Sequence, residues 1–137
     1  MSKHSNDRIP FVDLAKQFSL IKNDVMPAIG SVAEEAAFIR GPALTDFEER
    51  FADLHNIKHA IGVASGTDAL SISVRTLEIG PGDEVVTVPN TWISTAFAIS
   101  HAGATPVFVE INPDTHQMDP AALEKALTPR TKAVIPV

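Results

Sequence analysis

The spacing of hydrophobic residues along the chain changes near residue 59. Before that point apolar residues recur every three to four positions in two stretches. This spacing predicts two amphipathic helices, one from Val12 into the thirties and one over residues 44–54, ending near His55 and Asn56. Pro27 is expected to start or kink the first helix. Residues 1–10 are polar and end in a proline, so we expect a loose arm there.

From residue 59 onward, short apolar runs alternate with helical segments. This alternation is typical of repeated βαβ units and a parallel sheet, and nearly all-apolar strands are expected to be covered on both faces. The predicted strands span residues 60–64, 84–88, 106–110 and 133–137. The predicted helices span residues 67–77 and 91–101, and a third opens with Asp119 as its cap and Pro120 in its first turn. We therefore expect an α/β fold, with an arm and helices over residues 1–58 and the first part of an α/β domain over residues 59–137.

The chain ends inside the last apolar run, AVIPV, without a turn, cap or polar tail. A complete domain rarely ends in this way. We therefore expect the chain to be the N-terminal part of a longer protein, with apolar surface that further elements would cover.

Composition narrows the possible partners. The chain has 137 residues, 45% of them hydrophobic, which is enough for one domain with a real core. A net charge of -6, spread along the chain, makes nucleic acids and anionic membranes poor partners. Without cysteine there is no disulfide framework, thiolate metal site or cysteine nucleophile. No apolar leader or membrane-spanning stretch is visible, and we expect a cytoplasmic protein.

The loop after the first predicted strand, Ser65-Gly66-Thr67-Asp68, has the parts of an anion site. Ligands of parallel α/β proteins bind outside the carboxyl ends of the strands. Gly66 allows close approach to the backbone, the following amides begin a helix, and Thr67 adds a hydroxyl. The same residues also suit an ordinary capped helix, with Ser65 as the cap. The local sequence leaves both interpretations open.

The loop after the second predicted strand carries Trp92, the only tryptophan of the chain. Its indole could present a face to a planar ring, although most single tryptophans are packing residues. A ring platform next to an anion loop suggests a planar, phosphorylated aromatic cofactor. The chain has neither a Gly-x-Gly-x-x-Gly nor a Gly-x-x-x-x-Gly-Lys motif, which disfavours a generic nucleotide-binding domain.

Taken as a set and in this order, seven segments resemble the N-terminal region of the DegT/DnrJ/EryC1/StrS family of sugar aminotransferases, which depend on pyridoxal 5'-phosphate (PLP). They are IPFVDL, IRGPAL, FEERFA, SGTDAL, IGPGDEVVTVPNTWISTAFAI, GATPVFVEINPDT and LTPRTKAVIPV, which together extend over residues 9–137. The resemblance implies the large domain of a fold-type I transferase, a three-layer sandwich with a mostly parallel sheet. It also implies PLP at the carboxyl edge of the sheet and active sites at a homodimer interface.

The resemblance also implies roles for individual residues. Gly66 and Thr67 match positions that bind the cofactor phosphate, and Trp92 matches the aromatic position stacked on the pyridine ring. Gly41 and Pro42 match a segment near the substrate. We expect no metal site, because the histidine and acidic residues of the chain lack the spacing of a zinc or calcium ligand set.

Members of the family move an amino group from glutamate or glutamine to a keto group on a nucleotide-linked sugar. The lysine that forms a Schiff base with PLP and the aspartate at the pyridine nitrogen belong to family segments that would follow Val137. We therefore expect no catalytic residue in this chain and no transamination by the chain alone. Two alternatives remain, a PLP- or pyridoxamine phosphate-dependent sugar dehydratase of the same family, and an inactive fragment that acts as a binding or dimerisation module.

Overall fold

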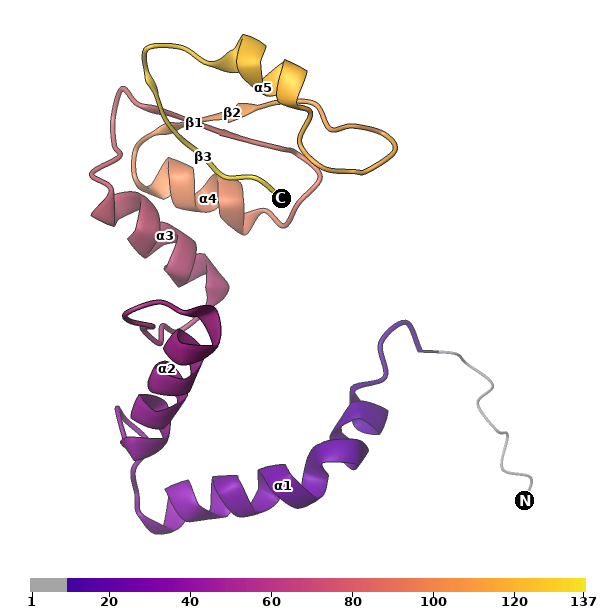
Figure 1. Cartoon of the computed structure of the whole chain (residues 1–137), viewed down its shortest axis with the longest axis vertical. Helices are drawn as coiled ribbons and strands as arrows, with labels where there is room; N and C mark the ends of the chain where they lie inside the picture. Colours follow the sequence, from indigo (N-terminus) through magenta and orange to yellow (C-terminus); the bar gives the residue numbers. More distant parts are fainter. Residues whose placement is uncertain (1–9) are drawn as a thin grey trace, which may run out of the picture. The chain divides into compact units, whose positions relative to one another are not determined.

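The computed structural model describes residues 10–137 of the chain, which divide into two compact units (Figure 1). The first unit ends at Gly62, and the second spans Val63–Val137. The loose arm expected for residues 1–10 lies outside the described residues, apart from Pro10. No helix within residues 10–137 is both long and apolar enough to cross a membrane. The cytoplasmic location stays a prediction.

The first unit contains the two expected helices, α1 (Leu14–Glu34) and α2 (Pro42–His55). Asp13 caps α1, because its carboxylate accepts a hydrogen bond from the Lys16 amide at 2.9 Å. Pro27 lies inside α1 and does not start it. Helix α2 begins with a proline in its first turn and ends at Asn56, whose left-handed φ of 53° closes the helix.

The prediction of a strand at residues 60–64 is wrong. The segment contains no assigned strand, and Ile61 is 80% exposed. The Gly62 amide donates instead to the Glu48 carboxylate at 2.6 Å. A strand needs a neighbour to pair its amides and carbonyls, and no strand within residues 10–137 pairs with this segment. An apolar run alone therefore does not make a strand here.

The second unit begins with helix α3 (Gly66–Thr76) and then alternates strands with helices. The elements that follow are β1 (Glu84–Thr87), α4 (Ser94–His101), β2 (Thr105–Phe108), α5 (Pro120–Ala126) and β3 (Thr131–Val134). The strands form a sheet of order β2-β1-β3 in which β1 pairs in parallel with both neighbours. The βαβ prediction is confirmed for these elements, with no end displaced by more than three residues.

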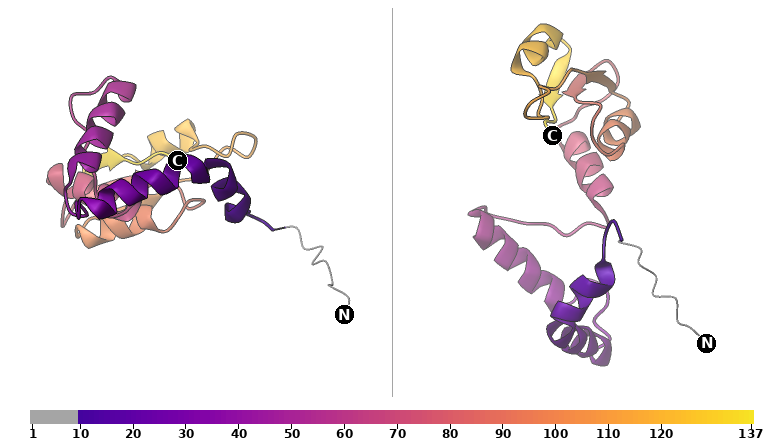
Figure 2. Two further views of the ribbon diagram at one scale, coloured as in Figure 1. Left: turned by 90° about the horizontal axis from the view of Figure 1, so that it is seen from below. Right: turned by 90° about the vertical axis from the view of Figure 1, so that its right-hand side faces the viewer.

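The core of the second unit lies on both faces of β1. Helices lie on both sides of the sheet (Figures 1 and 2). Val85 packs with Val74 of α3 and Ile99 of α4, whereas Val86 faces the opposite cluster, against which Leu123 of α5 packs. Successive residues of a strand point to opposite faces, which explains the division. The unit therefore has three layers, with α3 and α4 on one face of the sheet and α5 on the other.

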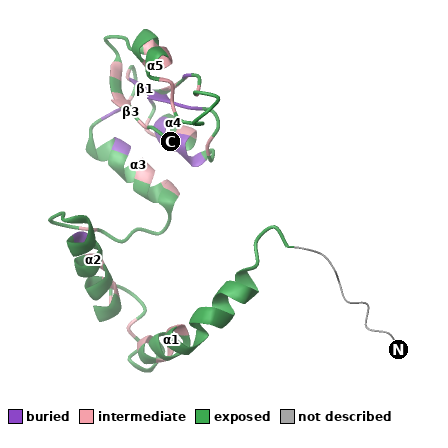
Figure 3. Cartoon of the chain, turned by 45° about the vertical axis from the view of Figure 1, so that its right-hand side comes forward, coloured by how far each residue is buried: buried purple, intermediate pink, exposed green. Residues whose placement is uncertain are grey.

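Coverage on both faces, expected for all the strands, holds only for β1. All four residues of β1 are buried, whereas the outer strands β2 and β3 are partly exposed (Figure 3). Phe108 of β2, for example, is 52% exposed. The reason is position in the sheet, because β1 lies in the middle and each outer strand has one unpaired edge among the described residues.

Candidate functional site

The first turns of α3 and α4 lie next to each other. The hydroxyl oxygens of Thr67 and Ser94, which are 27 residues apart in the sequence, are separated by 2.7 Å. Trp92 lies two residues before Ser94, in the loop that follows β1. The structure therefore brings the segment of Gly66 and Thr67 next to the segment of Trp92, at the carboxyl end of β1.

The start of α3 is a capped helix. The Ser65 hydroxyl accepts a hydrogen bond from the Asp68 amide and donates to the Asp68 carboxylate, both at 3.1 Å. The amides of Gly66 and Thr67, the two residues before Asp68, take no part in this cap. No acceptor for them is found within residues 10–137. A cap and an anion site use different amides. The two interpretations left open by the sequence are therefore compatible.

Gly66 has open space around its α-carbon. No protein atom lies within 4 Å of the place that a β-carbon would take, and its φ is not positive. Neither packing nor backbone conformation within the described chain therefore requires a glycine at this position. The open space lies beside two free amides and a hydroxyl, which fits an anionic group such as a phosphate.

Gly41 and Pro42 have a structural explanation. Gly41 is the N-cap residue of α2, and Pro42 is the first residue of that helix. A β-carbon on Gly41 would lie 2.4 Å from the carbonyl oxygen of Ala37, so packing alone excludes a side chain. Both residues belong to the first unit, and their proximity to the substrate stays a prediction.

Trp92 is not a core residue in the described structure. It is 78% exposed, so the indole is free to contact a ligand. Its backbone carbonyl accepts a hydrogen bond from the Thr95 amide at 3.3 Å, which joins the loop to the start of α4. Asn90 in the same loop donates from its side chain to the His116 carbonyl at 3.2 Å and so links the loops after β1 and β2.

Ser94 could not be identified from the sequence. It stands at the start of an apolar helix, where a serine carries no distinct signal, and its partner Thr67 is distant in the sequence. Only the packing of α3 against α4 places the two hydroxyls together. Ser94 is 7% exposed, so its position is set by the surrounding structure.

The pKa of Glu84 is shifted, at the opposite end of β1. Hydrogen bonds from the Thr128 hydroxyl and the Arg130 guanidinium hold the pKa of this carboxyl below its ordinary value. The Glu84 side chain is 10% exposed, and the Arg130 Nε–H lies 2.9 Å from its carboxylate. These contacts tie the start of β1 to the segment before β3. Their role is structural.

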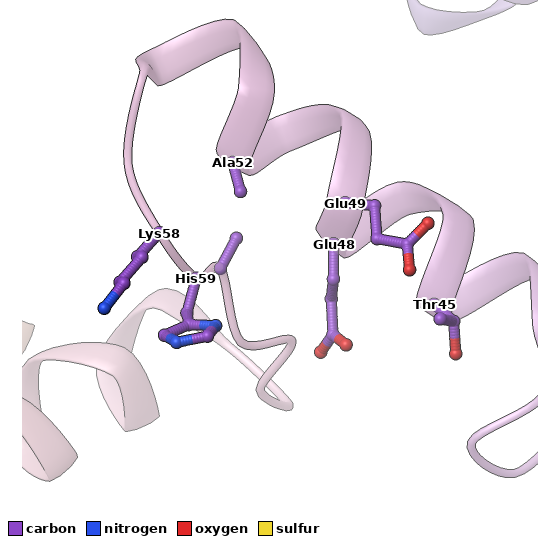
Figure 4. Close-up of a pocket in the computed structure, with 7 residues that line it drawn as sticks. Thr45, Glu48, Glu49, Ala52, Lys58 and His59 are labelled. Atoms are coloured by element: carbon purple, nitrogen blue, oxygen red, sulfur yellow. The ribbon is translucent and has the colours of Figure 1, made fainter.

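A separate hollow of about 190 Å³ lies in the first unit, with Glu48 and Glu49 on α2 and Lys58 and His59 on the segment that follows (Figure 4). The Glu48 carboxylate already accepts a hydrogen bond from the Gly62 amide. No group of three or more histidine, aspartate or glutamate side chains within residues 10–137 is arranged to hold a metal ion. We assign no ligand to this hollow.

These features define a parallel α/β protein with two helix N-termini and an exposed aromatic side chain at the carboxyl edge of its sheet. The model of the DegT/DnrJ/EryC1/StrS aminotransferase family matches residues 19–137, and the chain belongs to this family.

Two curated relatives share more than 40% of the aligned residues with this chain. The UDP-N-acetyl-3-dehydro-alpha-D-glucosamine 3-aminotransferase of Acidithiobacillus ferrooxidans is 46% identical over 132 residues, which cover 96% of this chain and 36% of the relative. The dTDP-3-amino-3,4,6-trideoxy-alpha-D-glucose transaminase of Streptomyces venezuelae is 43% identical over 136 residues, or 99% of this chain and 36% of the relative. The chain thus spans about a third of the length of these relatives.

Solved structures give the same result for the fold. DesV of S. venezuelae, in complex with a ketimine intermediate, superimposes with a TM-score of 0.90 at 43% identity, over 94% of this chain and 35% of DesV. NtdA of Bacillus subtilis, with its bound cofactor pyridoxamine phosphate (PMP), has a TM-score of 0.88 at 32% identity, over 94% of this chain and 30% of NtdA. The expected fold-type I aminotransferase architecture is confirmed.

Proposed function

We propose that the full-length protein is a PLP-dependent aminotransferase that moves an amino group from glutamate or glutamine to the keto group of a nucleotide-linked sugar. The names of the UDP-sugar and dTDP-sugar transaminases among its relatives support the substrate class. The observation that carries the proposal is the 2.7 Å contact between Thr67 and Ser94, which joins an open helix N-terminus to the loop of the exposed Trp92.

In this proposal the cofactor phosphate binds at the start of α3. The free amides of Gly66 and Thr67 donate to it, and the Thr67 hydroxyl adds a further donor. The dipole of α3 contributes about 0.3–2 kcal/mol to the binding of an anion at this end of the helix. The Asp68 carboxylate is the competing negative charge, and it is engaged by the Ser65 hydroxyl.

Trp92 supplies the surface on which the pyridine ring stacks, worth about 0.5–1.5 kcal/mol beyond the area buried. PLP, when bound, supplies the electron sink that amino-group transfer needs. The residues of this chain hold its phosphate and its ring in one orientation. We assign no catalytic residue to this chain.

The activity is tested with the full-length protein, PLP, glutamate or glutamine, and keto sugars linked to UDP or dTDP. We expect an amino sugar nucleotide, detected by mass spectrometry, together with the keto acid of the donor. Loss of water from the sugar without transfer of nitrogen would instead favour the dehydratase. Absence of both products with every keto sugar tested would contradict an enzymatic role.

We also propose that the full-length protein forms a homodimer. Large apolar side chains are exposed along α1, including Phe18 and Ile21. A hollow of about 380 Å³ with an almost entirely apolar lining adjoins them, formed by Val25, Ala28, Ile29, Val32 and Phe38. Burial in a subunit interface would remove this surface from water. Sedimentation equilibrium tests the proposal, and a monomer at assay concentration would contradict it.

A further inference from the structure

Either hydroxyl could donate the hydrogen bond between Thr67 and Ser94, and the choice of donor determines whether Thr67 can also donate to an anion. We propose that Ser94 is a positioning residue for the cofactor phosphate. Its hydroxyl donates to the Thr67 hydroxyl oxygen, which leaves the single proton of Thr67 free for the phosphate. The inference rests on the proposed function, because it assigns a second residue to the same phosphate site.

The direction follows from counting protons. Each hydroxyl has one proton to donate and two lone pairs that accept. If Thr67 donated to Ser94, it would offer an incoming anion only lone pairs. If Ser94 donates to Thr67, the Thr67 proton remains available. A phosphate oxygen accepts hydrogen bonds, so a bound phosphate selects the second arrangement. A chain of two hydroxyls also polarises each member, which strengthens the outer hydrogen bond.

Ser94 is more deeply buried than Thr67, which is partly exposed. It is the first residue of α4 and is 7% exposed. Helix α4 is fixed to the sheet by Ala98 and Ile99, which are fully buried in the core cluster that includes Val85. A hydroxyl on such a helix has a fixed position, and its hydrogen bond to Thr67 would hold the Thr67 side chain in place for a ligand.

The position of Ser94 also joins the two ends of the proposed site. Trp92 precedes it by two residues, and the Thr95 amide donates to the Trp92 carbonyl. The same first turn of α4 therefore holds both the loop of the ring platform and the hydroxyl that orients the phosphate donor. A shift of α4 would move both contacts together.

The competing explanation is that two hydroxyls pair only to satisfy each other in a partly buried place. In that case, removing the Ser94 hydroxyl would change stability, and its effect on phosphate binding would be the same with and without the Thr67 hydroxyl. A double-mutant cycle separates these two explanations.

The experiment measures the dissociation constant of PMP for the full-length protein without cofactor, by calorimetry, because PMP binds without a covalent bond to the protein. The variants are Ser94→Ala, Thr67→Ala and the double variant. We expect Ser94→Ala to weaken PMP binding about threefold to tenfold. In the Thr67→Ala background the same change should have no further effect. Ser94→Cys, which replaces the hydroxyl by a larger and weakly donating thiol, should also weaken PMP binding and provides a second variant if Ser94→Ala does not fold.

Ser73→Ala is the matched control, because the Ser73 hydroxyl donates within α3 to the Ala69 carbonyl at 2.8 Å. It should leave PMP binding unchanged. The inference would be overturned if Ser94→Ala weakened PMP binding equally in the wild-type and the Thr67→Ala background. It would also be overturned if both Ser94 variants bound PMP normally while Thr67→Ala bound it weakly. A wild-type protein that does not bind PMP would instead contradict the proposed function itself.

Discussion

Gly66 and Gly41 both stand where a helix begins, but the structure requires only one of them to be glycine. A β-carbon on Gly41 would overlap the Ala37 carbonyl, whereas a β-carbon on Gly66 would meet no protein atom within 4 Å. The family resemblance assigns Gly66 to phosphate binding. The open space supports the proposed phosphate site, because no protein atom occupies the position beside Gly66.

Replacing Gly66 by alanine should separate binding from folding. Alanine is the better helix former by up to about 1 kcal/mol, so the Gly66→Ala protein should unfold at the same temperature or higher. The added methyl group occupies the space proposed for the phosphate, and PMP binding should weaken at least tenfold, by about 1.4 kcal/mol. Gly30→Ala is the control, because Gly30 also has no atom within 4 Å but lies on α1. Unchanged PMP affinity in Gly66→Ala would remove Gly66 from the site.

Replacing Trp92 tests the ring platform. Trp92→Ala should weaken PMP binding about twofold to twelvefold, the equivalent of about 0.5–1.5 kcal/mol of stacking, and Trp92→Phe should retain most of the affinity. Since the side chain is 78% exposed, thermal unfolding of the free protein should change little. Leu77→Ala, at an exposed apolar position on the same unit, serves as the control. Equal PMP affinity in Trp92→Ala and wild type would exclude stacking.

At the scale of elements, local signals predicted the start of α5 correctly. The Asp119 carboxylate accepts from the Ala121 amide at 2.8 Å and Pro120 begins α5, as the sequence indicated. Such caps depend on neighbours two or three residues away and are therefore readable from sequence. Strand formation is different, because the apolar run at residues 60–64 has no pairing partner in the described chain. The Thr67–Ser94 contact was equally unpredictable, since it depends on how two helices pack.

The link between β1 and the segment before β3 should make stability depend on pH. The pKa of Glu84 is lowered in the folded protein from an ordinary value of 4.5, so its charge stabilises the fold above that pH. The contribution is lost as the pH falls below 4.5 and through the lowered folded pKa. Glu84→Gln should therefore lower the unfolding temperature at pH 7 and have little effect well below the folded pKa.

Thermal unfolding followed by circular dichroism between pH 7 and pH 2 checks this expectation. Glu124→Gln removes an exposed carboxylate on α5 and serves as the control. A Glu84→Gln protein whose unfolding temperature falls with acidity as steeply as that of wild type would show that the ion pair carries no net stabilisation, as is common for pairs with an exposed partner.

At the scale of the whole molecule, burial is unevenly divided. The fully buried apolar side chains, such as Val85 and Ile99, belong to the second unit, whereas α1 has no buried residue among those described. Helices in folded proteins gain most of their stability from the packing of an apolar face against the rest of the protein. The second unit should therefore be the more stable part of the chain.

Hydrogen exchange of the 137-residue chain would measure this difference. We expect the amides of β1 and α4 to exchange slowest and those of α1 to exchange fastest among the helices. In the full-length protein, α1 should gain protection if its apolar surface is covered in the proposed dimer. Equal protection of α1 and β1 in the isolated chain would contradict the division. So would slower exchange in α1.

The two ends of strand β1 make different contacts. Glu84 anchors the strand at its amino end, and the loop of Asn90 and Trp92 begins just beyond its carboxyl end, about 13 Å away at the usual rise per residue. Substitutions separated by this distance and without shared partners combine additively. Substitutions in the loop, including those that test the proposed ring contact, should therefore leave the contribution of Glu84 to stability unchanged. A more stable set of contacts around Glu84 could therefore offset the loss of stability caused by substitutions in the loop.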